Sequence, residues 1–192
     1  MRHSKDEKAA SHERIVAVAA AQIRERGTEQ PGVAEIMRAA GLTHGGFYKH
    51  FASRDDLIAE AVGCALTENE PEVARLLCEA DDPLGAFADW YVSEAHRDDA
   101  AHGCGVVALG ADATRAGGAV REAYRAQVDR YLAHVQALIG GDDPDARRRA
   151  TVTLSAMVGA VAIARALGPT AVSDEILQDV RAAVRERRLL PE

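Results

Sequence analysis

The stretch of sequence that decides the fold is Gly41-Leu42-Thr43-His44-Gly45-Gly46-Phe47-Tyr48-Lys49-His50-Phe51. Before it, apolar residues recur with the 3.6-residue period of a helix, which predicts a short helix over residues 33–40 that ends at Gly41. The Thr43 hydroxyl stands where it can cap a second helix, and three residues is the usual length of the turn in a helix-turn-helix. The sequence therefore predicts two short helices that cross steeply.

The second predicted helix has one apolar and one polar face. Phe47 and Phe51 are one turn apart and are expected to point inward. The opposite face carries small, polar or basic residues, namely His44, Gly45, Tyr48 and Lys49. Gly45 and Gly46 each weaken a helix by about 1 kcal/mol relative to alanine. A reason to have them is close approach of the backbone to a partner, such as the wall of a DNA major groove.

Charge is distributed unevenly along the chain. The 192 residues together have a formal charge of −7, which by itself argues against a DNA-binding protein. Residues 1–54, however, hold nine Lys and Arg and six acidic residues, so they carry +3 and the remainder carries −10. The basic excess coincides with the motif, and an acidic body disfavours DNA binding elsewhere.

Cysteine use and hydropathy indicate the compartment. Three cysteines, at positions 64, 78 and 104, are odd in number and widely spaced, which fits a reducing cytoplasm better than a disulfide framework. No apolar run reaches the roughly 20 residues that a membrane span needs, and the polar N-terminus lacks a signal-peptide core. We expect a soluble, cytoplasmic protein.

Helical periodicity continues through the rest of the chain, without the alternation typical of strands. Residues 1–10 are expected to form a flexible arm, residues 11–52 a DNA-binding head and residues 53–192 a ligand-binding and dimerisation body. Ser53, followed three residues later by Asp56, predicts the start of the helix that joins the head to the body. Further helices are expected after Pro83, over residues 120–140 and 144–167, and from a cap at Ser173, whereas residues 104–113 are expected to be only weakly helical. The predicted fold class is all-α, with about nine helices.

The N-terminal residues resemble the TetR family of bacterial one-component transcriptional regulators. The resemblance runs without gaps from about residue 11 to residue 62, and the rest of the chain matches only in layout. It rests on the predicted helix that runs from residues 13–16 to residues 26–27 and on residues 33–36 and 39–43. Two further motifs carry it, Phe47-Tyr48-Lys49-His50-Phe51 and Ser53-Arg54-Asp55-Asp56-Leu57-Ile58. It implies a ligand-responsive repressor of a palindromic DNA operator.

The resemblance also implies the contacts of the head. The residues expected to contact DNA phosphates are Thr43, Tyr48, Lys49 and His50. Those expected to lie nearest the base edges are His44, Gly45 and Gly46, and Arg54 is expected to reach the DNA backbone from the next helix. Because one short recognition helix reads few base pairs, two heads about one turn of DNA apart are needed. The family layout puts the interface of such a homodimer on the last two helices, Pro144–Leu167 and the helix from Ser173 to about Arg188.

Two positions depart from the family pattern. The Ser or Thr that usually caps the first helix of the motif is replaced by Pro31-Gly32, so a backbone amide would have to make that phosphate contact. The residue at position 44 is often Lys, whereas His44 is mostly neutral at pH 7, which would make its contact weaker and pH-dependent.

The body is expected to hold a pocket between the helix that begins at Pro83 and the long helix that ends near Gly140. Aromatic and aliphatic residues there supply apolar walls with phenol and indole groups, which suits a small, largely apolar effector. For each residue taken singly, plain core packing is the simpler interpretation. The candidates are Phe87, Trp90, Tyr91, Val106, Val107, Tyr124, Val128 and Tyr131. Coupling to the head is expected through the helix of residues 53–70.

Three alternatives use other residues. His96, Asp98, Asp99, His102 and Cys104 cluster within nine positions and are of types that bind zinc or nickel, although their spacing matches no strong metal motif and a solvated turn is favoured. Cys104, between Gly103 and Gly105, could act as a thiol sensor, with a small buried packing residue as the simpler reading. An all-α enzyme is disfavoured because no catalytic or phosphate-binding motif is found. We expect no metal and no cofactor.

Overall fold

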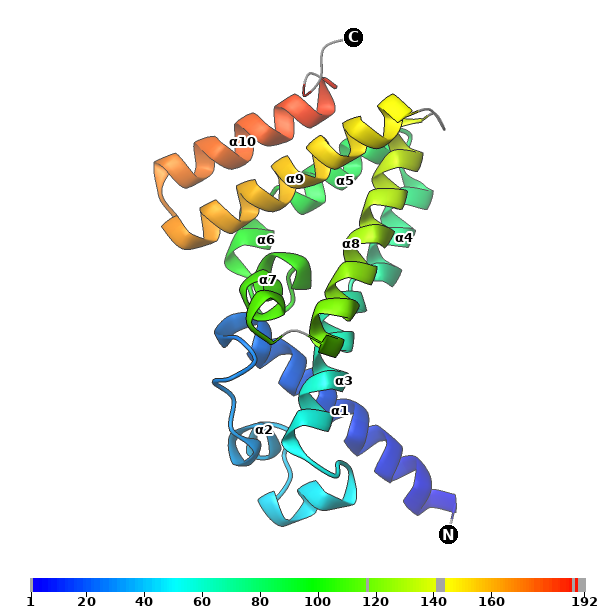
Figure 1. Cartoon of the computed structure of the whole chain (residues 1–192), viewed down its shortest axis with the longest axis vertical. Coiled ribbons are helices and arrows are strands. Elements are labelled where there is room, and N and C mark those ends of the chain that lie inside the picture. The colour runs from blue at the N-terminus through cyan, green and yellow to red at the C-terminus, as the bar shows by residue number, and fades with distance from the viewer. Residues whose placement is uncertain (1, 117, 141–143, 188, 190–192) are drawn as a thin grey trace.

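The chain folds into helices throughout the residues that the computed structural model describes, which are 2–116, 118–140, 144–187 and 189. These residues form ten α-helices and one short 3-10 helix, and they contain no strand. The predicted all-α class is therefore correct, and the number of helices is slightly larger than expected. Figure 1 shows an elongated molecule with a small head at one end and a larger body at the other.

The head consists of four elements at the lower end of Figure 1. They are α1 (Arg2–Arg26), α2 (Val33–Ala39), the 3-10 helix η1 (His44–Lys49) and α3 (Arg54–Thr67). Gly27 and Gly41 follow α1 and α2 with φ of +80° and +74°, the left-handed conformation that ends a helix and that suits glycine. Helix α3 begins as predicted, because the Ser53 side chain accepts a hydrogen bond from the Asp56 backbone N–H at 3.1 Å.

The first helix begins earlier than the sequence suggested. The predicted flexible arm of residues 1–10 is, from Arg2 onward, the N-terminal part of α1, and Met1 lies outside the described residues. The physical reason is local, because residues 5–10 are Lys, Asp, Glu, Lys, Ala and Ala, without Gly or Pro, and most of them favour a helix. Further along α1, Ile15, Ala19 and Ile23 are fully buried and pack the helix onto the head.

The body contains seven helices. They are α4 (Glu70–Glu79), α5 (Pro83–Tyr91), α6 (Glu94–Asp98), α7 (Gly105–Ala116), α8 (Gly118–Ile139), α9 (Pro144–Leu167) and α10 (Ala171–Arg185). Figure 1 shows α9 and α10 as an antiparallel pair at the end of the body farthest from the head. The segment near Cys104 is a regular helix of twelve residues, α7, where the sequence indicated only weak helicity.

The start of α10 differs from the prediction. Thr170, and not Ser173, is the N-cap, and the Thr170 side chain accepts a hydrogen bond from the Ser173 backbone N–H at 3.3 Å. The Ser173 hydroxyl is instead buried, where it accepts from Arg97 Nη1 at 2.9 Å and donates to the Ala164 carbonyl. Contacts with α6 and α9 thus engage the Ser173 hydroxyl, and Thr170, three positions earlier, caps the helix. The predicted end of this helix, Arg188, lies outside the described residues.

Tight packing joins α7 to the head. A Cβ atom at Gly105 would lie 2.4 Å from the Ala65 carbonyl oxygen, so only glycine permits α7 to start this close to α3. Asp112 of α7 is buried and accepts hydrogen bonds from the Thr28 backbone N–H at 2.9 Å and from the Thr28 hydroxyl at 2.7 Å. The head and the body therefore share polar and apolar contacts, in addition to the continuous chain of α3 and α4.

Candidate nucleic-acid interface and ligand cavity

The predicted recognition element exposes its polar face. Phe47 and Phe51 are 2% and 4% exposed, and their rings stack with centroids 5.6 Å apart, as expected for the core of the head. Tyr48, by contrast, is 75% exposed, and His44, Gly45 and Lys49 are exposed as well. Gly46 and His50 are half-buried. The two phenylalanines thus fix a thin outer surface that has no role in the core.

The element is a 3-10 helix and not the predicted α-helix. Thr43 occupies the N-cap position, but its hydroxyl makes no cap hydrogen bond; its carbonyl accepts from the Gly46 N–H at 3.0 Å. A three-residue repeat is adopted in short pieces where α-helix propensity is low, and two consecutive glycines lower it here. A Cβ at Gly45 would meet nothing within 4 Å, so the fold of the head does not require glycine there.

His50 lies at the junction of the recognition element and α1. Its ring is 6.0 Å from the ring of His12, which in turn stacks on Phe51 at 4.5 Å and contacts the Glu60 carboxylate at 2.7 Å. Burial lowers the pKa of His50, and the positive charges of His12, Lys8 and Lys49 lower it further. Lys5, Lys8, His12 and His50 border a shallow groove of about 450 Å³ together with Ala9 and Glu13. The cationic side chains of α1 thus lie next to the exposed, partly basic face of the recognition element.

Arg54 has a structural task that the sequence did not reveal. Its Nη2 donates to the backbone carbonyls of Thr28, Glu29 and Pro31, at 2.6, 3.1 and 3.4 Å. The guanidinium therefore closes the loop between α1 and α2. Gly32 is the N-cap of α2, in extended conformation and without a side-chain cap bond, so the start of α2 offers only backbone amides to a partner.

The body contains a cavity of about 230 Å³ between α4, α5 and α8. It has an apolar wall and three polar groups, and it is lined by Glu70, Val73, Ala74, Leu77, Phe87, Tyr131, His134 and Leu138. Phe87 and Tyr131 were predicted, and the location between the helix from Pro83 and the helix ending near Gly140 agrees with the prediction. The α4 residues were missed, because in the sequence they show only the pattern of a surface helix.

The other predicted lining residues are distributed elsewhere. Trp90 borders a separate groove with His96 and His102, and Val107 borders a third groove with Arg24 and Arg165. Tyr91 and Val106 are core residues, and the Tyr124 hydroxyl donates to the Val106 carbonyl at 2.9 Å. Val128 is half-buried and packs against the core. The sequence pattern could not separate core from cavity, since both require apolar residues on the same helix face.

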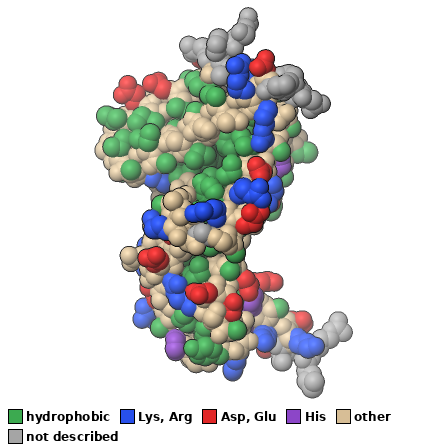
Figure 2. Space-filling view, in the orientation of Figure 1, with side chains coloured by type: hydrophobic (Ala, Val, Ile, Leu, Met, Phe, Trp, Pro, Cys, Tyr) green, Lys and Arg blue, Asp and Glu red, His purple; other side chains and the backbone are tan. Residues whose placement is uncertain are grey.

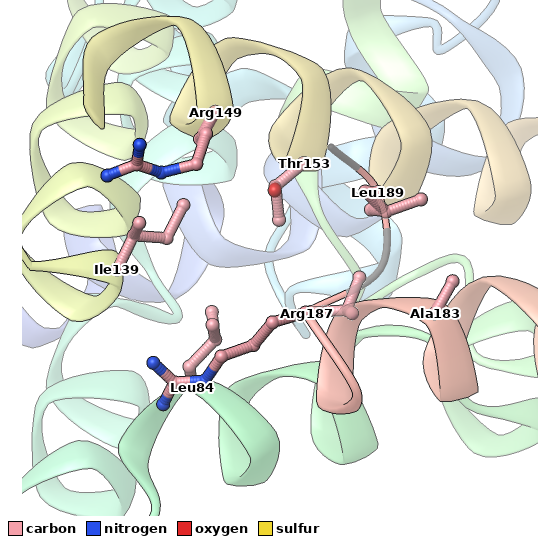
Figure 3. A pocket seen from close by; sticks show the side chains of 8 residues that line it. Leu84, Ile139, Arg149, Thr153, Ala183, Arg187 and Leu189 are labelled. Carbon is pink, nitrogen blue, oxygen red and sulfur yellow. The ribbon is translucent and has the colours of Figure 1, made fainter. Parts of the chain in front are cut away.

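A further cavity, of about 150 Å³, was not expected. Figure 3 shows it between α8, α9 and α10, with the guanidinium groups of Arg149 and Arg187 on the same side and apolar side chains between them. Arg187 lies 3.9 Å from the Asp82 carboxylate. The lining residues are Leu84, Ile139, Arg149, Thr153, Ala183, Val184, Arg187 and Leu189. They come from four separate segments of the chain, so no local sequence motif predicts this cavity.

The residues of the metal hypothesis do not form a ligand set. His96 is buried, its Nε2 accepts from the Cys104 backbone N–H at 2.8 Å, and its Nδ1 donates to the Tyr91 carbonyl at 2.6 Å. Burial lowers the pKa of His96 to about 4. With both ring nitrogens engaged, the neutral ring serves the structure and leaves no lone pair for a metal. His102 is exposed and contacts the Asp99 carboxylate at 3.0 Å.

Cys104 is a buried packing residue, in agreement with the simpler of the two interpretations of the sequence. It is 1% exposed, and its Sγ lies 3.8 Å from the Tyr131 hydroxyl. Its environment is therefore closed to solvent, which does not favour a thiol sensor that must meet an oxidant from solution.

Comparison with known proteins identifies the head. Residues 15–61 match the family model of bacterial regulatory proteins of the tetR family. The whole chain resembles a TetR transcriptional regulator from Chloroflexus aurantiacus, with 28% identity and a TM-score of 0.80 over 97% of this chain and 98% of that one. The head of this chain is therefore similar to that of the tetR family, and the whole chain is similar to a TetR regulator in fold. A search of curated proteins gave no significant match.

More distant structures share the fold. A TetR-family regulator from Cytophaga hutchinsonii is 15% identical, with a TM-score of 0.79 over 94% of this chain and 96% of that one. The reduced form of Escherichia coli NemR is 18% identical, with a TM-score of 0.76 over 92% and 96% of the two chains. These structures show that the fold is shared, and the match of residues 15–61 supports a DNA-binding regulator of the TetR type.

The last two helices carry exposed aliphatic side chains. Ile163, Leu167 and Val172 are about half exposed, at 51%, 44% and 57%, and Val152 is 36% exposed. Figure 2 shows hydrophobic side chains gathered at the end of the body where α9 meets α10. By length and composition alone, α9 is apolar enough to cross a membrane, which differs from the expectation from the sequence. In the structure, α9 packs against α6, α7, α8 and α10.

Proposed function

We propose that this TetR-family protein is a cytoplasmic, ligand-responsive repressor that binds a palindromic operator as a homodimer and is released by a small, largely apolar effector. The observation that carries the DNA-binding part is the surface of η1. Its phenylalanines anchor the element in the core, while an aromatic and a basic side chain remain free of the fold. Such a surface is of little use to a monomeric soluble protein, and it suits a DNA groove.

The proposed contacts follow from position. Thr43, Tyr48, Lys49 and His50 hold the DNA phosphates, and His44, Gly45 and Gly46 stand nearest the base edges. Arg54 contributes by fixing the loop before α2, and its nitrogens other than Nη2 can reach the phosphate backbone. The cationic groove beside α1 adds phosphate contacts through Lys5 and Lys8.

The homodimer is proposed to form through α9 and α10. A helix without a continuous polar face is either central or shared with a partner, and α9 has exposed aliphatic side chains in its second half. Two copies of the α9–α10 pair make a four-helix interface, which places the two heads on the same side of the molecule. The heads then read two half-sites about 34–36 Å apart, one turn of DNA.

Release of the DNA is proposed to run through α3 and α7. Helix α3 starts in the head and ends beside α4, which lines the 230 Å³ cavity. Helix α7 touches the head through the Asp112–Thr28 hydrogen bonds. An effector that moves α4 or α8 changes the tilt of α3 relative to these fixed contacts, and therefore changes the spacing of the heads.

The experiment is a binding titration on DNA from the region upstream of the protein's own gene and of neighbouring genes. We expect a specific complex of one dimer per site, whose affinity falls steeply with salt. Tyr48→Ala combined with Lys49→Ala should abolish the specific complex, and Arg75→Ala, an exposed change on α4, should leave it intact. The absence of any specific, salt-sensitive complex would contradict the proposal.

Dimerisation is tested separately. Ile163→Glu combined with Val172→Glu places charges on the exposed apolar face, and sedimentation should then show a folded monomer with much weaker operator binding. Dimers that persist in this variant would place the interface elsewhere.

A further inference from the structure

We propose that the cavity between α8, α9 and α10 binds a compact monocarboxylate, that is, a molecule with one carboxylate and an apolar part of about six carbon atoms, such as benzoate. Its lining shares no residue with the lining of the cavity between α4, α5 and α8, so it is a second ligand site of the body. The inference does not depend on the proposed function. It is drawn from the position of Arg149, from the charges around this side chain and from the size of the cavity.

Arg149 is directed inward at the start of α9. It ends a run of three consecutive arginines, of which Arg147 and Arg148 are exposed. Arg149 is half-buried and lines the cavity, on the face of α9 that also carries the buried Ala150 and Thr153. A guanidinium that faces an apolar space loses part of its hydration, and an anionic partner compensates for this cost.

The charges around the cavity leave a place for one anion. Within the part of the chain that the structure describes, Arg149 has no ion pair, whereas Arg148 lies 3.2 Å from the Asp145 carboxylate. The second guanidinium of the lining, on Arg187, lies 3.9 Å from the Asp82 carboxylate, and both of these side chains are more than half exposed. Two cations and one carboxylate leave a charge of +1 at the cavity. A monoanion neutralises this charge, and an amine would increase it.

The polar groups lie where one carboxylate can meet them. Figure 3 shows the guanidinium groups of Arg149 and Arg187 on the same side of the cavity. Thr153 lies one turn after Arg149 on α9, is 6% exposed, and has a hydroxyl without a hydrogen-bond partner among the described residues. A guanidinium matches the two oxygens of a carboxylate, and the Thr153 hydroxyl can donate to the same group. A neutral ligand would leave Arg149 without a counterion.

The size and wall of the cavity select the apolar part of the ligand. The cavity has a volume of about 150 Å³, and an apolar cavity of about this volume accommodates benzene. Leu84, Ile139, Val184 and Leu189 supply aliphatic surface from α5, from the end of α8, from α10 and from the segment after it. One ring or a short branched chain therefore fits. Drug-sized ligands need about 300–1,000 Å³, so multi-ring compounds are too large.

The test uses four probes in ligand-observed NMR titrations of the full-length protein without DNA, near neutral pH. Benzoate has the ring and the carboxylate, benzamide and benzamidine have its shape but are neutral and cationic, and acetate has the carboxylate without the ring. We expect benzoate to bind saturably and at least about tenfold more tightly than each of the others. Equal or tighter binding of benzamide or benzamidine would overturn the role of the guanidiniums, and equal binding of acetate would overturn the role of the apolar wall.

Variants locate the site and separate binding from folding. Arg149→Gln should weaken benzoate binding about tenfold or more and leave the thermal midpoint of the unliganded protein unchanged, because no ion pair is lost. Thr153→Val should weaken binding about threefold. Ala183→Leu should abolish binding, because it fills the space and leaves both guanidiniums in place. Unchanged benzoate affinity in Arg149→Gln or in Ala183→Leu would refute the proposal.

Two controls complete the test. Arg148→Gln removes the same charge at the adjacent, exposed position and should leave benzoate affinity unchanged. An equal loss in Arg148→Gln and Arg149→Gln would show that benzoate responds to the overall charge of this end of α9. Ala74→Leu fills the cavity between α4, α5 and α8 and should also leave benzoate affinity unchanged. A loss there would place benzoate in that other cavity. Since no DNA is present, failure of the repressor proposal leaves these results untouched.

Discussion

The head and the body of this protein are both built from helices, but they differ in what those helices surround and what they expose. In the head, Phe47 and Phe51 are packed together and the polar face of η1 is left to the solvent. In the body, α4, α5 and α8 enclose a cavity whose wall is largely apolar. The head thus presents a polar surface on a packed core, and the body encloses a largely apolar space.

The largest expected effect breaks the head. Phe47→Ala removes a ring that is 2% exposed and stacked on Phe51, so it should lower the free energy of unfolding by about 3–5 kcal/mol. Urea denaturation measures this loss. Tyr48→Ala is the matched change on the adjacent, exposed residue and should alter stability by less than about 0.5 kcal/mol. A similar loss in both variants would show that η1 is not divided into an inner and an outer face.

The next effect concerns the buried histidine of the body. The pKa of His96 is lowered from 6.5 to about 4 by burial, so the unfolded chain binds a proton more readily than the folded one. The stability that this group contributes is complete above pH 6.5 and is lost as the pH falls toward 4. Between pH 7.5 and pH 5 the loss should be about 2 kcal/mol. His96→Gln should reduce this pH dependence, and a wild-type slope in that variant would assign the effect to other groups.

The contact between the two regions can be weakened directly. Asp112→Ala leaves the Thr28 N–H and hydroxyl without an acceptor and should lower the free energy of unfolding by about 1–3 kcal/mol. In the repressor proposal it should also change how strongly the effector alters DNA affinity. Arg115→Ala removes only the exposed neighbour, 3.5 Å from Asp112, and serves as the control. Intact coupling in Asp112→Ala would show that the Asp112–Thr28 hydrogen bonds do not carry it.

A smaller effect tests the DNA surface without disturbing the fold. Lys49→Ala should leave the thermal midpoint unchanged, because the side chain is exposed, and should weaken DNA binding in a salt-dependent manner. The slope of log affinity against log salt should fall by about 1, the value for one phosphate contact. An unchanged slope would remove Lys49 from the interface.

The smallest effect on stability concerns Gly45. A Cβ atom there would meet nothing within 4 Å, and the backbone is not in the left-handed region, so Gly45→Ala should leave the protein equally stable or stabilise it by up to about 1 kcal/mol. DNA affinity should nevertheless fall, if the backbone approaches a base edge at this position. A variant with unchanged affinity would show that DNA does not come close to residue 45.

Much of the architecture could be predicted because it depends on local patterns. The stripe of α3, the apolar face of α5 and the helix ends at Gly27 and Gly41 follow from periodicity and from backbone conformations that glycine favours. The places where prediction failed have two causes. The cap of α10 depended on contacts of Ser173 with Arg97 and Ala164, whereas η1 and the start of α1 depended on local helix propensity that the pattern of apolar residues does not report.

The sequence by itself determined the resemblance of the head to the TetR family, the all-α class and the division of η1 into core and surface residues, because all three are encoded in short-range spacing. Only the tertiary structure decided which aromatic residues line the cavity, that Arg54 closes a loop and that both ring nitrogens of His96 bond to backbone groups. These facts depend on segments far apart in the chain, and an apolar or polar residue on a helix face looks the same in the sequence whether it meets a neighbour or an empty space.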